Sequence, residues 1–284
     1  MLVGDIMSSP VVVVQPEDSL ARVRNLMLRN RISRVVVTRD ERPIGVVTKA
    51  DIARCMAEIS KRIKSLDEVS VCEVMTSPVI VIGVRDSIRD AAKEMLSHGI
   101  SGLPVVDSLG YLVGIVTKTD ITRYYAENCS SIYKVSELME VEVPTVQRGH
   151  TIYRVIDVLQ TSSVDRVVVV DGKSPVGIIT HTDISFIDFP LRKERKFIRV
   201  ARKITEDYVE ITRFYYLPTA EEVMSSPVIT IARESDAKEA ASLMLEHEIG
   251  GLPVVDRAGS LVGIILKSGF IKALSTEKCW RGSS

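Results

Sequence analysis

The feature that most constrains the fold of this chain is a fourfold internal repeat. A short segment centred on methionine recurs four times, at spacings of 68, 64 and 85 residues. The four methionines are Met7, Met75, Met139 and Met224. Each copy is followed by a valine-rich segment and then by a segment that opens on glycine, such as GIVTKTD from Gly114. Repeats of this length indicate structural units that bury their apolar faces against each other.

The second repeat predicts the secondary structure of each unit. After the SPVI segment, a helix is expected because apolar residues recur at helical spacing, and Gly99 would end it. These residues are Ile88, Ala91, Ala92, Met95 and Leu96. Two strands should follow as a hairpin, and a last helix should begin at the Thr-x-x-Asp segment. The order is β-α-β-β-α, which makes the fold class mixed α/β. A single unit leaves one sheet face bare, so we expect pairs at residues 1–128 and 134–278.

This pattern resembles the CBS domain, named for cystathionine β-synthase, and the two pairs resemble Bateman modules. Four repeats in one chain are similar to the γ subunit of AMP-activated protein kinase and its archaeal relatives. The resemblance implies a non-catalytic regulatory sensor that binds AMP, ADP, ATP or S-adenosylmethionine and signals to a protein partner. It implies no required cofactor.

The Thr-x-x-Asp segments are the first candidate ligand residues. Each stands where a strand ends and a helix begins, and a helix N-terminus favours a phosphate. The resemblance implies that the threonine faces phosphate and the aspartate holds the ribose 2′- and 3′-hydroxyls. The candidate pairs are Thr48 with Asp51, Thr117 with Asp120, and Thr180 with Asp183. The alternative is a plain helix capping box, and both roles can hold together. The fourth repeat has Leu266 and Gly269 at these positions and lacks the pair.

Two arginines are the candidate phosphate ligands. Arg34 and Arg166 stand where repeats two and four have Gly102 and Gly251, and the resemblance makes this a phosphate position. Ser33 and Ser101 precede Arg34 and Gly102. Repeat three instead has Asp165, which would repel a phosphate unless it pairs with Arg166 or the ligand carries positive charge.

The resemblance places the adenine in an apolar slot near the opening strand of the partner repeat. Its candidate residues are Val11, Val79, Ile32 and Ile100, with Pro10 and Pro78 shaping the turns. The alternative is that these side chains simply belong to the core.

The segment from about residue 186 to 220 differs from the repeats. Read as a helix, it carries Arg192, Arg195, Lys196, Arg199, Arg202 and Lys203 on one face. Such a basic amphipathic helix could contact a protein, RNA, DNA or an anionic membrane. We slightly favour a linker helix packed on its own protein. The alternative function is therefore an interaction scaffold whose ligand sites are vestigial.

Composition narrows the functional classes that remain possible for this chain. Lys+Arg and Asp+Glu are both 37, so the formal charge is zero, which disfavours a nucleic-acid-coating protein. No apolar run approaches the roughly 20 residues of a membrane span. The His and Cys spacings match no metal or catalytic motif, so we expect neither a metal site nor an enzyme. Scattered cysteines fit the cytoplasm, and few Asn and Gln hint at a thermophile. We expect either a monomeric four-repeat disc or a homodimer.

Overall fold

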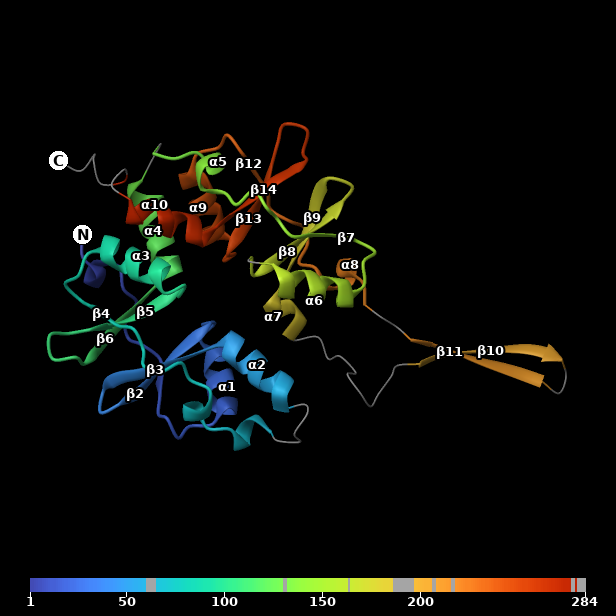
Figure 1. Cartoon of the computed structure of the whole chain (residues 1–284), viewed down its shortest axis with the longest axis horizontal. Coiled ribbons are helices and arrows are strands. Elements are labelled where there is room, and N and C mark those ends of the chain that lie inside the picture. Colours follow the sequence, from blue (N-terminus) through green and yellow to red (C-terminus); the bar gives the residue numbers. More distant parts are fainter. Residues whose placement is uncertain are drawn as a thin grey trace. The chain divides into compact units, whose positions relative to one another are not determined.

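The computed structural model of the chain describes residues 1–59, 65–129, 132–162, 164–185, 197–205, 208–215, 218–276 and 279. The chain divides into two compact units. Unit one comprises Met1–Val141, Thr230–Ala258 and Val262–Ser284, and unit two comprises Glu142–Ile229 and Gly259–Leu261. Figure 1 shows the elements coloured along the sequence.

Each repeat contains one three-stranded sheet. A short first strand runs parallel to the second strand, which pairs antiparallel with the third. The sheets are β1 (Val13–Val14), β2 (Arg34–Arg39) and β3 (Arg42–Thr48); β4 (Ile82–Gly83), β5 (Gly102–Val106) and β6 (Leu112–Thr117); β7 (Thr145–Gln147), β8 (Arg166–Asp171) and β9 (Ser174–Thr180); β12 (Ile231–Ala232), β13 (Gly251–Val255) and β14 (Leu261–Leu266).

Two helices accompany each sheet. The first lies between strands one and two: α1 (Leu20–Arg29), α3 (Ile88–Ser97), α6 (Ile152–Thr161) and α9 (Ala237–Glu246). The second follows strand three: α2 (Lys49–Ile59), α4 (Lys118–Asn128), α7 (His181–Ser185) and α10 (Lys267–Ser275). The β-α-β-β-α order predicted from the sequence is confirmed. In α3, Ile88, Ala91, Ala92 and Met95 are buried, whereas Leu96 is 37% exposed because it lies at the edge of the apolar face. Ser87 caps the helix by accepting from Asp90 N at 3.1 Å.

A short helical segment opens each repeat, and it packs on the partner repeat. These segments are η1 (Val3–Asp5), η3 (Val71–Glu73), α5 (Val135–Leu138) and α8 (Ala220–Val223); a further turn, η2 (Leu66–Glu68), precedes η3. Their first amides bond across to the partner: Val3 N to Asp86 O (2.8 Å), Val71 N to Asp18 O (2.9 Å), Val135 N to Ser235 O (2.9 Å) and Ala220 N to His150 O (2.8 Å). Repeats one and two therefore exchange openings, and so do repeats three and four.

The repeated methionine fixes this exchange. Its side chain lies against the glycine of the partner's third strand: Met7 on Gly114, Met75 on Gly45, Met139 on Gly263 and Met224 on Gly177. A Cβ at Gly177 would stand 2.6 Å from Met224 Cγ and 2.8 Å from its Cβ. The glycines are therefore required by close approach of the partner, which explains why both residues recur in every repeat.

The compact units do not follow the predicted modules. Unit one holds repeats one and two, and also the fourth repeat with the opening of the third; unit two holds the third repeat with the opening of the fourth. The division at residues 1–128 and 134–278 stays a prediction, as does the disc or homodimer.

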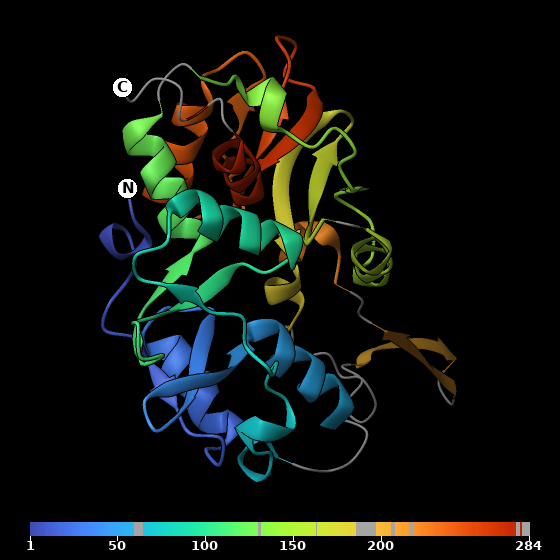
Figure 2. The same ribbon diagram turned by 60° about the vertical axis from the view of Figure 1, so that its left-hand side comes forward.

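Within unit one, helices of repeats two and four pack together. Helix α10 lies against α3 and α4, and α4 lies against α9 (Figure 2). At the centre, the rings of Tyr125 and Phe270 have centroids 4.9 Å apart, and both side chains are fully buried. The contact joins two repeats that are far apart in the sequence.

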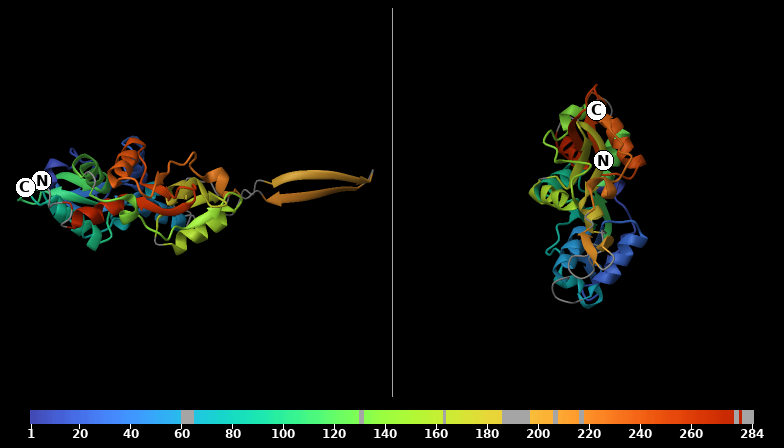
Figure 3. Two further views of the ribbon diagram at one scale, coloured as in Figure 1. Left: turned by 90° about the horizontal axis from the view of Figure 1, so that it is seen from above. Right: turned by 90° about the vertical axis from the view of Figure 1, so that its right-hand side faces the viewer.

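The predicted basic linker helix is wrong where the structure describes it. Residues Phe197–Thr205 form β10 and Tyr208–Tyr215 form β11, an antiparallel pair in which Arg202 lies opposite Glu210 (Figure 3). Arg199, Arg202 and Lys203 are therefore strand residues. The segment is rich in β-branched and aromatic residues, whose strand preference outweighs the helical spacing of the charges. Residues 186–196, with Arg192, Arg195 and Lys196, lie outside the described residues.

Among the described residues, none of the helices has the length and apolar character needed to span a membrane.

The Met–Gly contact predicts a stability effect. Gly177→Ala should destabilise the protein by about 1–3 kcal/mol, because the added methyl overpacks the site against Met224. Gly149→Ala is the matched control, since a Cβ there meets nothing within 4 Å. Thermal unfolding should show a lower Tm for Gly177→Ala than for Gly149→Ala. Equal Tm values would show that the glycine is not required by packing.

Candidate ligand site

The Thr-x-x-Asp segments lie at the strand-to-helix junctions as predicted, and they do cap the helices. In α4, the backbone N and Oγ1 of Thr117 donate to Asp120 Oδ2 at 2.8 and 2.6 Å. Thr48 donates to Asp51 Oδ2 at the same two distances, and Thr180 donates to Asp183 Oδ2 at 2.7 Å through both groups. Helix capping therefore accounts for only one of the two carboxylate oxygens of each aspartate, Oδ2.

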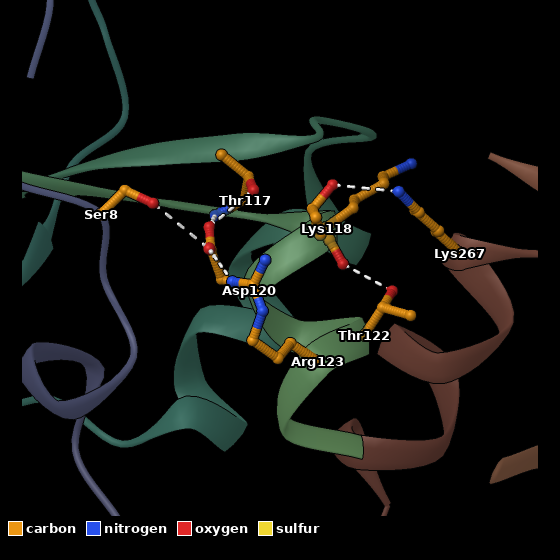
Figure 4. A network of polar contacts seen from close by, with 8 residues as sticks. Ser8, Thr117, Lys118, Asp120, Thr122, Arg123 and Lys267 are labelled. Carbon is orange, nitrogen blue, oxygen red and sulfur yellow. Dashed lines mark hydrogen bonds and ion pairs between the residues drawn. The ribbon is translucent and has the colours of Figure 1, made fainter. Parts of the chain in front are cut away.

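The second carboxylate oxygen of Asp120 has weaker partners. Its Oδ1 accepts from Ser8 Oγ at 3.3 Å and from Arg123 Nη1 at 3.4 Å (Figure 4). Asp51 Oδ1 likewise faces Arg54 Nη1 at 3.3 Å. Asp51 and Asp120 are only 8% and 4% exposed. Each aspartate therefore uses Oδ2 for the helix cap and retains an Oδ1 that stronger hydroxyl donors could engage.

Ser8 brings the partner repeat to this carboxylate. It belongs to the opening of repeat one, whereas Asp120 belongs to repeat two, and a backbone bridge joins Ser8 to Ile115. Sequence reasoning missed Ser8, because the exchange of openings cannot be read from one repeat alone. It also missed Arg54 and Arg123, although both stand three residues after an aspartate on the same helix face.

The two serines lie next to the helix starts. Ser33 O accepts from Lys49 N at 3.0 Å, and Ser101 O accepts from Lys118 N at 3.2 Å. Ser33 is exposed and Ser101 half-buried. Each predicted serine therefore lies beside the Thr-x-x-Asp segment of its own repeat.

Arg34 crosses from repeat one to repeat two. Its backbone pairs with Thr48 in the sheet, but its Nη2 donates to Ser101 Oγ at 2.9 Å and its Nη1 to Ser101 O. Burial lowers the pKa of the Arg34 guanidinium to about 10, and the negative charge of Asp120 opposes that shift. The group remains a cation at neutral pH. The structure thus brings together Arg34, Ser101 and Asp120 from the predicted set.

Repeat three arranges its arginine differently. Arg166 Nε lies 2.8 Å from Asp165 Oδ1, so the guanidinium is paired with its sequence neighbour. This is the pairing under which Asp165 would not repel a phosphate outright. The same ion pair engages the guanidinium group that would otherwise bind an incoming phosphate.

The fourth repeat lacks the pair for a visible reason. A Cβ at Gly269 would stand 2.8 Å from the carbonyl oxygen of Leu138, so the opening of repeat three occupies the place of an aspartate. Lys267 begins the same helix and donates from Nζ to Thr119 Oγ1 at 3.1 Å. Figure 4 shows Lys267 reaching the first turn of α4, where Thr117, Lys118 and Asp120 lie. Repeat four therefore contacts the repeat-two site.

The predicted adenine residues have mixed surroundings. Val11, Ile32, Val79 and Ile100 are half-buried, and Ile32 packs against the core of repeat one. Pro10 and Pro78 are exposed. Their role in holding adenine stays a prediction. Among the described residues, no group of three or more His, Cys, Asp and Glu side chains could hold a metal ion.

Comparison with known proteins identifies the repeat. The CBS domain model matches residues 3–58, 71–127, 135–187 and 220–276. The uncharacterized protein MJ1404 of Methanocaldococcus jannaschii is 26% identical over 281 residues, which cover 97% of this chain but 62% of that protein. This chain thus spans less than two thirds of that relative.

Two solved structures extend the comparison. The protein MJ1225 of M. jannaschii, 26% identical over 92% of this chain and 94% of its own, is a proposed archaeal homologue of g-AMPK. Its crystal structure matches with a TM-score of 0.76 and 23% identity, covering 96% of this chain and 99% of that one, so the fold is shared. The CBS domain protein PAE2072 from Pyrobaculum aerophilum, complexed with AMP, covers 43% of this chain and 90% of its own at 26% identity, with a TM-score of 0.39.

The capping geometry predicts a cost for losing the threonine hydroxyl. Thr117→Val should destabilise the ligand-free protein by about 1 kcal/mol, because Asp120 Oδ2 loses the hydroxyl bond of Thr117 and keeps only the bond from its backbone N. Thr151→Val is the control, since Thr151 precedes α6 without a side-chain cap bond. Denaturant unfolding measures both. An equal loss in the two variants would contradict the capping role.

Proposed function

Because this chain belongs to the CBS domain family, we propose that it is a non-catalytic sensor of adenosine-containing ligands held between paired repeats. The ligand class is AMP, ADP, ATP or S-adenosylmethionine, and no cofactor is required. The observation that carries the proposal is the buried Asp120 carboxylate. Its Oδ1 faces a junction where Ser8 and Arg34 arrive from repeat one.

The chemistry of this junction suits a nucleotide. A carboxylate oxygen accepts two hydroxyl donors, and ribose presents two adjacent hydroxyls. Asp120 Oδ1 exchanges its 3.3 and 3.4 Å contacts for shorter bonds when ribose binds. The positive end of the helix dipole at the start of α4 favours a phosphate, and the Arg34 guanidinium can leave Ser101 to form a fork with phosphate oxygens.

The same role is proposed for the threonine–aspartate pairs of repeats one and three. Thr48 with Asp51, and Thr180 with Asp183, have the same capping geometry as Thr117 with Asp120. Adenine packs beside the half-buried side chains of the candidate adenine slot, which are Val11, Ile32, Val79 and Ile100. AMP is the first ligand to test, since it is the ligand in the complex of the P. aerophilum protein.

A route for the signal is present in unit one. Helix α4 carries Asp120 in its first turn and packs on α9 and α10 of repeat four. Lys267 and Tyr125–Phe270 join these helices near the ligand site and at their centre. Ligand binding at α4 biases this packing, and a protein partner reads the change.

Removing the carboxylate tests the proposal. Asp120→Ala and Asp51→Ala should each weaken binding at their own site by at least tenfold, because hydrogen bonds to a charged group contribute about 1.5–3 kcal/mol each. Asp90→Ala is the control: Asp90 also caps a helix, through Ser87, but at the start of α3.

Calorimetry with AMP, ATP and S-adenosylmethionine gives the affinities. Thermal shift gives a second readout, since ligand at about 100 times its Kd adds about 2.7 kcal/mol. If none of these ligands shifts the wild type, or if the double variant with Asp51→Ala and Asp120→Ala shifts as far as Asp90→Ala, these aspartates serve only to cap their helices.

The alternative function, an interaction scaffold for RNA, DNA or a protein, now rests on a β-ribbon. Arg199 and Arg202 stand in β10, while Arg195 lies outside the described residues. Charge reversal at all three should leave AMP affinity within about twofold if these arginines serve a macromolecular partner, because none of them would then contact the nucleotide. Calorimetry at physiological salt measures this. A loss of tenfold or more would assign these arginines to the nucleotide phosphate.

A further inference from the structure

Repeats one and two, which form the first predicted module, differ at the position that begins the second strand. Repeat one has an arginine there and repeat two has a glycine. Arg34 begins β2 and Gly102 begins β5, so they hold equivalent positions, each opposite the threonine of its own repeat. Within each repeat, the residues beside these two positions are alike. Ser33 and Ser101 precede them, and Thr48–Asp51 and Thr117–Asp120 lie beside them with the same bond lengths.

The Arg34 guanidinium contacts repeat two. Its guanidinium donates to Ser101 O and Oγ in repeat two. Its charge interacts with Asp120, which raises the guanidinium pKa against the effect of burial. Arg34 therefore brings its positive charge to the repeat-two site, although its backbone belongs to repeat one.

Glycine at position 102 makes this possible. A Cβ at Gly102 would collide with Arg34 Nη1 and would lie 3.1 Å from Cζ and 3.2 Å from Cδ. Any side chain there would displace the guanidinium from Ser101. The two positions thus cannot both carry arginine in this arrangement, and the repeat-one side receives no charge from position 102.

We propose that the two sites of the first module take different adenosine ligands. The repeat-two site, with Asp120 and Arg34, takes an adenosine with an anionic 5′ group such as a phosphate. The repeat-one site, with Asp51 and with no arginine at position 102, takes an adenosine whose 5′ group has no net negative charge. This selectivity rests on the proposed function and adds a ligand class to each site.

The residues near Asp51 agree with this assignment. Arg54 is exposed, and its Nη1 lies 3.3 Å from Asp51 Oδ1, on the carboxylate that would hold ribose. Arg123 occupies the equivalent place beside Asp120 at 3.4 Å, so these two arginines do not distinguish the sites. Lys49 and Lys118 are equivalent as well, each beginning its helix. The difference in charge comes from Arg34, and Lys267 adds a second positive charge on the repeat-two side, where its Nζ donates to Thr119 Oγ1 at 3.1 Å.

The test compares AMP with adenosine and S-adenosylmethionine by calorimetry on the full chain. Every protein carries Asp183→Ala, which silences the candidate site of repeat three. In this background, Arg34→Met and Asp120→Ala should each weaken AMP binding at least tenfold. Asp51→Ala should weaken the binding of adenosine or S-adenosylmethionine by the same factor. Arg29→Met, at the exposed end of α1, is the control for loss of an arginine.

A charge swap sharpens the test. The double variant Arg34→Gly with Gly102→Arg should transfer AMP binding to the repeat-one site, so that it depends on Asp51. Thermal unfolding checks that this variant folds; if it does not, Arg34→Met still decides the question.

The outcomes separate two failures. AMP binding that survives Arg34→Met, or that falls equally in Asp51→Ala and Asp120→Ala, overturns the selectivity but leaves the adenosine sensor intact. No binding of AMP, adenosine or S-adenosylmethionine to the Asp183→Ala background overturns the proposed function of this module as well.

Discussion

The exchange of opening segments between paired repeats is the contact on which the rest of the structure depends. Each opening leaves its own sheet and places a methionine on the glycine of the partner's third strand. The buried Val3, Val71, Val135 and Ala220 anchor the four segments. A lone repeat would expose both its own opening and the surface that receives its partner's, so folding and pairing are one event. The same exchange brings Ser8 of repeat one to the carboxylate of Asp120 in repeat two, so the proposed site would be shared between the paired repeats.

In the proposed site, helix capping and ligand binding use the same aspartate without conflict. Oδ2 of Asp120 holds the start of α4, while Oδ1 faces the junction. The cap fixes the position of the buried carboxylate before any ligand arrives, which lowers the entropic cost of binding. In repeat four the same place is closed by the backbone of Leu138 against Gly269. That repeat instead contributes Lys267 to the neighbouring helix start.

Much of the fold could be predicted from the sequence, because each pattern of apolar and turn residues recurs in several of the four repeats and a single weak pattern is thereby supported by the others. The buried face of α3 and the Thr–Asp junctions follow from spacing alone. The exchange of openings could not be predicted, since it depends on which sheet a methionine reaches. The partners of Ser8 and Arg34 were hidden for the same reason. Residues 197–205 and 208–215 form strands and not the helix that the spacing of their charges predicts, because the strand preference of their β-branched and aromatic residues outweighs that spacing.

The most direct measurement is a crystal structure of the chain with AMP. The account predicts that the ribose hydroxyls lie within hydrogen-bond distance of Asp120 Oδ1. It also predicts that the phosphate contacts the Arg34 guanidinium, which has left Ser101. The contacts of Thr117 with Asp120 Oδ2 should persist, since the cap does not compete with ribose. AMP bound away from Asp120, or Arg34 still on Ser101 with AMP in place, would contradict the account.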